Sequence, residues 1–121
     1  MRPVFAFVFA PAFALAVLSA PAIAAQLLVV TQEGCHYCAA FDAQVAPAYP
    51  KTDLARRAPL RRADLHALPA DVTFTAPPVF TPTFVLIHDG RELGRIEGYA
   101  GDEFFWFLTE KLLDQHSTII D

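Results

Sequence analysis

The stretch QLLVVTQEGCHYC, residues 26–38, joins an apolar run to two closely spaced cysteines. Its first part, Gln26–Thr31, predicts a short buried strand that ends before Gly34. Beyond Cys35, apolar residues recur at helical spacing and prolines then end the pattern: Cys38, Phe41 and Val45, followed by Pro47 and Pro50. This order of strand, turn and helix places Cys35 at or near a helix N-terminus.

Downstream of this unit, the sequence predicts three more strands. Leu60–Leu65 is crowded with charges, which favours an edge position. Thr83–Ile87 is a continuous β-prone run, and Asp89 with Gly90 supplies a two-residue hairpin turn into a returning strand, Glu92–Glu97. The chain therefore predicts a hairpin after its first strand–helix–strand unit.

Two features complete the predicted fold. Leu93 and Ile96 do not share one face of an ideal strand, which indicates a bulge around Gly94. Acidic residues after Gly101 predict the start of a helix that continues through 104–114, whereas residues 66–78 contain turn residues and room for one short helical piece. We expect a small α/β sandwich, with a central mixed sheet and helices on both faces.

The N-terminal residues 1–24 have the pattern of a secretory signal peptide. Arg2 gives a positive start, residues 4–18 are almost wholly apolar, and Ala22-Ile23-Ala24 fits a small-x-small cleavage site. The alternative is an uncleaved membrane anchor, although the apolar run is shorter than a bilayer requires and contains prolines. We expect cleavage near Ala24, export, and a single mature domain over 25–121 with no stable membrane insertion.

Composition limits the classes of function. The 121 residues carry 9 Lys and Arg against 13 Asp and Glu, a formal net charge of −4, which argues against nucleic-acid binding by charge alone. Outside the cytosol, the 2 cysteines are driven toward a disulfide.

The Cys35-His36-Tyr37-Cys38 motif indicates thiol–disulfide exchange. A first sulfur can attack a disulfide while the second lies close enough to resolve the mixed disulfide. Unpaired backbone N–H groups at a helix N-terminus favour a thiolate. We assign Cys35 as the nucleophile, Cys38 as the resolving thiol because it lies on the buried stripe, and His36 as a stabiliser of the thiolate.

Three other interpretations of the cysteine pair compete with redox exchange. An inert disulfide across so short a loop stabilises a chain by only about 2 kcal/mol. A zinc site requires four ligands, and His36, His66, His88 and His116 show no paired spacing. Covalent haem requires a histidine directly after the second cysteine, where Ala39 stands. We expect no metal and no cofactor beyond the cysteines themselves.

Together with the cysteines, the triplet Thr81-Pro82-Thr83 before the predicted third strand resembles the thioredoxin-like superfamily. The resemblance covers essentially all of 25–121 and implies that Pro82 follows a cis peptide bond and faces the cysteines. It also implies that the backbone around Thr81 pairs with an extended substrate segment, and that Tyr37 shapes the substrate surface.

The chain departs from thioredoxin itself and is similar to smaller relatives. Gly34 replaces the tryptophan before the first cysteine, and Val29 stands where thioredoxins have an aspartate. The arrangement resembles the compact glutaredoxins, and most closely the SoxS family of periplasmic proteins of bacterial sulfur-oxidation (Sox) clusters. That resemblance implies a reductant that restores the sulfur carrier protein of thiosulfate oxidation and is recharged by a membrane thiol transporter.

The sequence therefore predicts a periplasmic thiol:disulfide oxidoreductase, a reductase and a monomer. Two alternatives stay open: a disulfide-donating oxidase, and a non-catalytic binding module that holds a metal through Cys35, Cys38 and His36.

Two further groups of residues lie outside this motif. The arginines at 56, 57, 61 and 62 favour a solvated face over a docking surface for an acidic partner. The run 104–108, FFWFL, exceeds what one helix face buries, so we expect a core helix, with partner docking as the alternative.

Overall fold

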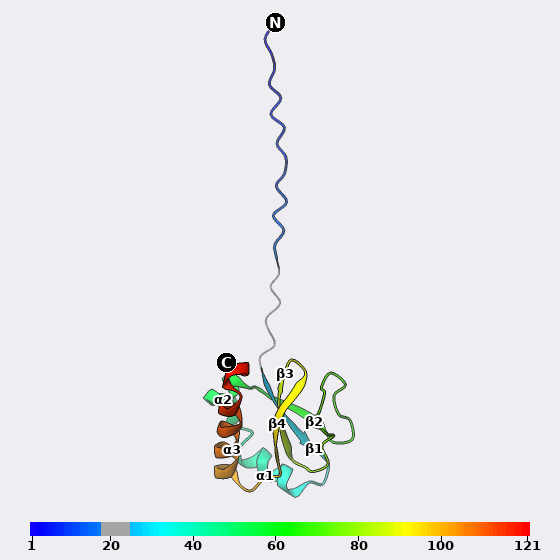
Figure 1. The fold of residues 1–121 in the computed structure, drawn as a ribbon, viewed down its shortest axis with the longest axis vertical. Coiled ribbons are helices and arrows are strands. Elements are labelled where there is room, and N and C mark those ends of the chain that lie inside the picture. Colours follow the sequence, from blue (N-terminus) through cyan, green and yellow to red (C-terminus); the bar gives the residue numbers. More distant parts are fainter. Residues whose placement is uncertain (18–24) are drawn as a thin grey trace.

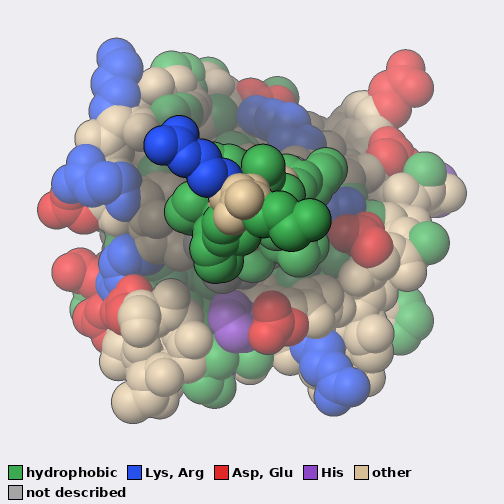
Figure 2. All heavy atoms as spheres, turned by 90° about the horizontal axis from the view of Figure 1, so that it is seen from above, with side chains coloured by type: hydrophobic (Ala, Val, Ile, Leu, Met, Phe, Trp, Pro, Cys, Tyr) green, Lys and Arg blue, Asp and Glu red, His purple; other side chains and the backbone are tan. Residues whose placement is uncertain are grey.

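A computed structural model describes residues 1–17 and 25–121. Residues 1–17 are exposed, form neither helix nor strand, and project away from the folded part (Figure 1). Figure 2 views the molecule from the side toward which residues 1–17 project, and basic and acidic side chains are intermixed on this face. The predicted cleavage site at Ala22-Ile23-Ala24 lies outside the described residues. Within 1–17 and 25–121, no helix is both long and apolar enough to cross a bilayer.

Four strands form one mixed sheet in the order β2-β1-β3-β4: β1 (Gln26–Thr31), β2 (Leu60–Asp64), β3 (Thr83–His88) and β4 (Arg91–Glu97). β1 runs parallel to β2 and antiparallel to β3, and β3 pairs with β4 as a hairpin. The edge position predicted for β2 is confirmed. Asp89 and Gly90 both have positive φ, 50° and 74°, as the tight turn between β3 and β4 requires.

The helices are α1 (His36–Gln44), α2 (Asp53–Arg57), α3 (Asp102–Gln115) and α4 (Ser117–Ile120), with a 3₁₀ turn, η1 (Tyr49–Lys51). All four α-helices contribute side chains to one apolar cluster on one face of the sheet. The opposite face is covered by the segment between β2 and β3, through Leu65, Leu68, Val72 and Phe74 (Figure 1).

This arrangement corrects the predicted helices on both faces. Residues 66–78 form turns and isolated bridges rather than a helical piece, and Thr73 pairs with Arg91 at the sheet edge. The sequence interpretation also missed α2. That helix is only one turn long, so it carries too few residues for a periodic pattern.

The two central strands alternate between the two faces. Leu27 and Val29 of β1 point into the larger cluster, whereas Leu28 and Val30 point into the smaller one. In β4 the pairing register shifts next to Gly94, which leaves one extra residue, Leu93. The shift lets Leu93 and Ile96 pack on the same cluster and confirms the predicted bulge.

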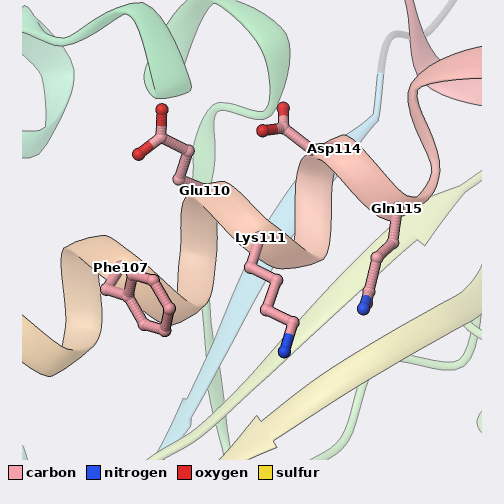
Figure 3. A pocket seen from close by; sticks show the side chains of 5 residues that line it. All are labelled: Phe107, Glu110, Lys111, Asp114 and Gln115. Carbon is pink, nitrogen blue, oxygen red and sulfur yellow. The ribbon is translucent and has the colours of Figure 1, made fainter.

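The aromatic run on α3 divides between core and surface. Phe105 is buried, and Trp106 stacks on the buried ring of Tyr49 at 6.1 Å between centroids. Phe104 and Phe107 are exposed, and Phe107 lines a shallow depression formed by side chains of α3 alone (Figure 3). α3 is therefore a core helix with a partly apolar outer face.

Each of the four arginines singled out in the sequence pairs with an aspartate: Arg56 with Asp53, Arg57 with Asp114 and Asp121, Arg61 with Asp71, and Arg62 with Asp42. The positive charges are locally compensated, which favours the predicted solvated face over a basic docking patch.

Candidate active site

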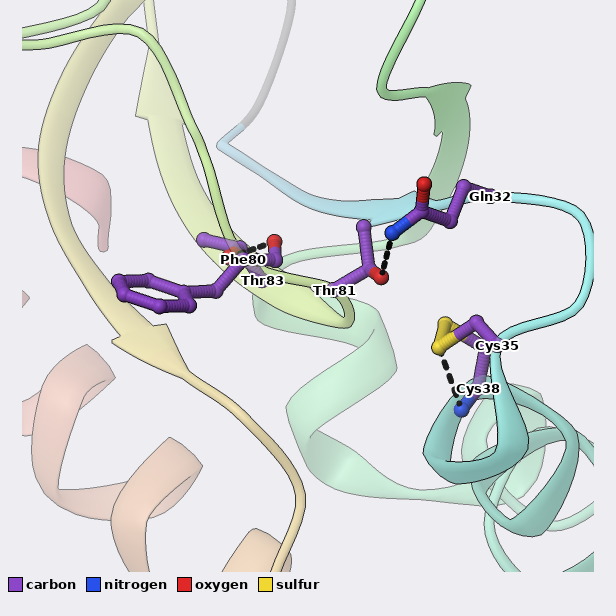
Figure 4. The surroundings of a disulfide bond; sticks show 6 residues. All are labelled: Gln32, Cys35, Cys38, Phe80, Thr81 and Thr83. Atoms are coloured by element: carbon purple, nitrogen blue, oxygen red, sulfur yellow. Dashed lines mark hydrogen bonds between the residues drawn. A yellow bond between two sulfur atoms is a disulfide. The ribbon is translucent and has the colours of Figure 1, made fainter.

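The disulfide between Cys35 and Cys38 lies at the start of α1 (Figure 4). Gly34, with φ of 75°, turns the chain out of the loop after β1, and Cys35 is the N-cap of the helix. The Cys38 backbone N–H donates a hydrogen bond to Cys35 Sγ at 3.1 Å. The first cysteine sulfur therefore occupies the position at which helix N–H groups stabilise negative charge.

The two cysteines differ in exposure. Cys35 is half-buried, whereas Cys38 is only 4% exposed and lies on the inner side of α1. Cys35 is therefore the more accessible of the two cysteines. This asymmetry suits a pair in which one sulfur meets the partner and the other acts afterwards.

His36 and Tyr37 project from the first turn of α1. Both are exposed, Tyr37 at 59%, and their rings meet edge to face with centroids 5.5 Å apart. Neither ring is buried in the core, so both are available to a molecule that approaches Cys35.

A second loop lies beside the disulfide. The Thr81–Pro82 peptide is cis and Pro82 is buried. Gln32 Nε2 donates a hydrogen bond to Thr81 Oγ1 at 2.8 Å, so the loop after β1 is tied to the loop before β3 (Figure 4). The Phe80 ring points away from the disulfide in the same view. The structure thus ties Thr81 to the loop that leads into Cys35, and Pro82 follows Thr81 directly.

The loop after β4 completes this end of the molecule. The Gly98 N–H donates to the Pro82 carbonyl oxygen at 2.8 Å, and the Tyr99 hydroxyl donates to Gln44 Oε1 on α1. Burial, and then the charge of Asp102, raise the pKa of the Tyr99 hydroxyl further above the neutral range. The loop after β4 is therefore fastened both to the loop before β3 and to the C-terminal end of α1.

A hollow, here called the site hollow, opens beside the disulfide between the end of β1 and the first two turns of α1. Its lining includes Gln32, Cys35, His36, Cys38 and Asp42. Asp42 Oδ1 accepts a hydrogen bond at 2.8 Å from an Nη of Arg62, which reaches over from β2.

Sequence reasoning missed Gln32, Asp42 and Arg62 as parts of this site. Their partners lie 20 or 49 residues away along the chain. Only one signal pointed toward any of them: Asp42 lies one helical turn beyond Cys38.

Metal binding requires several ligands close together. Among residues 1–17 and 25–121, the structure contains no group of three or more His, Cys, Asp or Glu side chains placed to hold a metal ion.

Comparison with solved structures finds a close match. The crystal structure of the periplasmic thioredoxin SoxS from Paracoccus pantotrophus, in its reduced form, is 46% identical in sequence. The match covers 75% of this chain and 97% of that protein, with a TM-score of 0.73. No protein-family model matches the chain, and no curated protein matches it.

Proposed function

Since this chain belongs to the thioredoxin family and is a thiol:disulfide oxidoreductase, we propose that it acts as a reductase in the periplasm. Cys35 is the attacking thiol in this proposal, and Cys38 is the resolving thiol. The observation that carries these two roles is the asymmetry of the pair: Cys35, at the helix N-cap, is half-buried, and Cys38 is almost fully buried.

The proposed reaction balances without a further cofactor. The Cys35 thiolate attacks one sulfur of a partner disulfide, forms a mixed disulfide and expels the other partner sulfur as a thiolate. Cys38 then loses its proton and attacks Cys35 Sγ, which releases the second partner thiolate. The partner gains two electrons and two protons, and the protein is left with the Cys35–Cys38 disulfide.

Five residues near the cysteines in the sequence or the fold have supporting roles in this proposal. His36 stabilises the Cys35 thiolate from the first turn of α1, and the exposed ring of Tyr37 supplies apolar contact. The backbone beside Thr81 pairs with an extended partner segment, and Pro82 fixes the shape of that loop. The hydrogen bond from Gln32 holds Thr81 next to the disulfide and supports this arrangement.

The partner and compartment extend the same proposal. The relative is described as a periplasmic thioredoxin, SoxS, which supports export of this chain with 1–24 as a cleaved signal peptide. The partner is the sulfur carrier protein of thiosulfate oxidation, and a membrane thiol transporter returns the site to the dithiol. The reduction potential of the Cys35–Cys38 pair distinguishes reduction of the partner from the opposite direction, donation of a disulfide to it.

A trapping experiment tests the roles of the two cysteines. We expect Cys38→Ser to accumulate a mixed disulfide between Cys35 and a disulfide-bearing peptide, seen by mass, because no thiol resolves it. Cys35→Ser is the matched control and forms little adduct, since Cys38 is 4% exposed. In denaturant both variants react alike, which assigns the difference to burial. Equal trapping in the folded state contradicts the assignment.

The reduction potential tests the direction. Alkylation across defined thiol buffers places a reductase at about −270 to −200 mV and a disulfide donor near about −120 mV. A pair that never cycles between dithiol and disulfide contradicts the oxidoreductase itself.

A further inference from the structure

One charged group in the site hollow takes no part in the proposed thiol–disulfide exchange. Asp42 lines the hollow together with both cysteines. It follows Cys38 by four residues on α1, so the two side chains lie on the same face of the helix, about one turn apart. A carboxylate therefore shares the hollow with the two sulfur atoms.

A carboxylate in this position opposes the first step of the exchange. Negative charge beside a thiol disfavours its thiolate, and the thiolate is the form that attacks. The N-terminus of α1 acts in the opposite direction, because its N–H groups favour the thiolate at Cys35. Without compensation, Asp42 would cancel part of this stabilisation.

Arg62 supplies the compensation from another element. Its guanidinium donates to Asp42 at 2.8 Å, and the two side chains are about half exposed, 50% and 47%. A pair this exposed adds little to the stability of the fold. The neighbouring Arg61 makes a similar pair with Asp71, also at 2.8 Å. Because adjacent strand residues point to opposite faces of the sheet, the Arg61–Asp71 pair lies on the face away from Asp42.

The other charged and titratable groups around the sulfurs do not duplicate this pair. His36 lies in the first turn of α1, and Glu33 lies in the turn before Cys35. The loop before β3, residues 79–83, carries no charged side chain. Arg62 is therefore the cation on a neighbouring strand that neutralises the carboxylate of the site hollow.

We propose that the Asp42–Arg62 ion pair sets how strongly the site stabilises the Cys35 thiolate, with Arg62 as a positioning residue that masks the Asp42 charge. The inference rests on the proposed role of Cys35 as the attacking thiol. Losing Arg62 exposes the carboxylate and disfavours the thiolate. Losing the carboxylate alone leaves the sulfurs with an uncompensated cation nearby and favours the thiolate.

Titration of Cys35 in a Cys38→Ser background tests this, because only one thiol then titrates. The apparent pKa is read from the rate of alkylation against pH. We expect Arg62→Gln to raise it and Asp42→Asn to lower it, each by about half a unit to one unit, a three- to tenfold change in the thiolate-to-thiol ratio. The double variant returns close to the parent value.

Arg61→Gln is the matched control, since it breaks a similar pair on the other face of the sheet, and we expect no shift. The inference is overturned if both single variants shift the pKa in the same direction, if neither shifts it, or if Arg61→Gln shifts it as much. A parent that forms no mixed disulfide at all instead contradicts the proposed function, so the two failures are distinguishable.

Discussion

Glu92 offers a sharp test of what holds the segment between β2 and β3 on the sheet. Its side chain is only 4% exposed and accepts hydrogen bonds from Arg95 at 2.6 and 2.7 Å and from the Thr75 N–H at 3.0 Å. Arg95 also donates to the Ala76 carbonyl. One carboxylate therefore joins β4 to the covering segment.

The expected cost of Glu92→Gln follows from these contacts. The amide keeps an acceptor oxygen but loses the charge opposite Arg95, and hydrogen bonds to charged groups contribute about 1.5–3 kcal/mol. Arg95 retains a weaker contact with Glu97 at 3.7 Å. We expect the free energy of unfolding to fall by about 2 kcal/mol, which lowers the melting temperature by about 10 °C in a domain of this size.

The pH dependence has a definite sign. Hydrogen bonds and the charge of Arg95 outweigh burial and lower the pKa of Glu92. The ionised group therefore stabilises the fold above its unfolded pKa of about 4.3, and this contribution is lost as the pH falls through the lower folded value. The difference between wild type and Glu92→Gln should shrink on acidification.

Thermal and urea unfolding between pH 3 and 7 measure both effects. Asp71→Asn is the control, because that carboxylate forms its ion pair at an exposed position and its loss should change little. Cys35 reactivity should not change, since Glu92 pairs with Ile87 at the far end of the hairpin from Pro82. The reasoning is refuted if the two variants unfold alike, or if the difference grows in acid.

Two further substitutions test the packing. Gly90→Ala should lower the free energy of unfolding by more than about 2 kcal/mol, because φ is 74° and a Cβ would lie 2.8 Å from the Asp71 carbonyl oxygen. Gly34→Ala is the control: φ is a similar 75° but the space around a Cβ is open, so the cost should be only about 1 kcal/mol. Equal losses of stability in urea unfolding would contradict the clash at Gly90. Tyr49→Phe should cost about 1–2 kcal/mol, because it removes the buried bond of 2.6 Å to the Ala58 carbonyl. Burial also raises the pKa of Tyr49, so the wild type should lose stability as the pH rises above about 10, and unfolding of Tyr49→Phe should show a smaller loss.

The first part of the site was predictable because its causes are local. An apolar run, a glycine and helical spacing define β1, the turn and the N-cap position of Cys35, and the structure has each of these within a residue. The bulge beside Gly94 was predictable for the same reason, since Leu93 and Ile96 fall on opposite faces of an ideal strand and a bulge is one way to bring them to the same face. The assignment of roles to Cys35, Cys38, His36, Tyr37, Thr81 and Pro82 stays a prediction, as do the boundary at Ala24 and the sulfur-carrier partner.

The expected helix on the second face failed for an equally physical reason. The smaller cluster needs apolar cover, but the sequence does not say what form the cover takes. Irregular chain from Leu65 to Phe74 provides it, held by Arg95 and by the pairing of Thr73 with Arg91. Apolar residues in an irregular segment of this kind recur at no fixed spacing, so hydrophobic periodicity does not distinguish the segment from an ordinary loop.

Local sequence was enough to predict the elements whose geometry depends on neighbouring residues: the first strand, the helix that starts after Cys35, and the Asp89-Gly90 turn. Which distant groups meet could be learned from the folded chain alone, because the sheet order β2-β1-β3-β4 carries them together. That order places Thr81 within hydrogen-bond reach of Gln32, and it brings Arg62 to Asp42 beside the sulfurs. Local patterns encode backbone angles and faces, whereas contacts across tens of residues depend on how the strands pair.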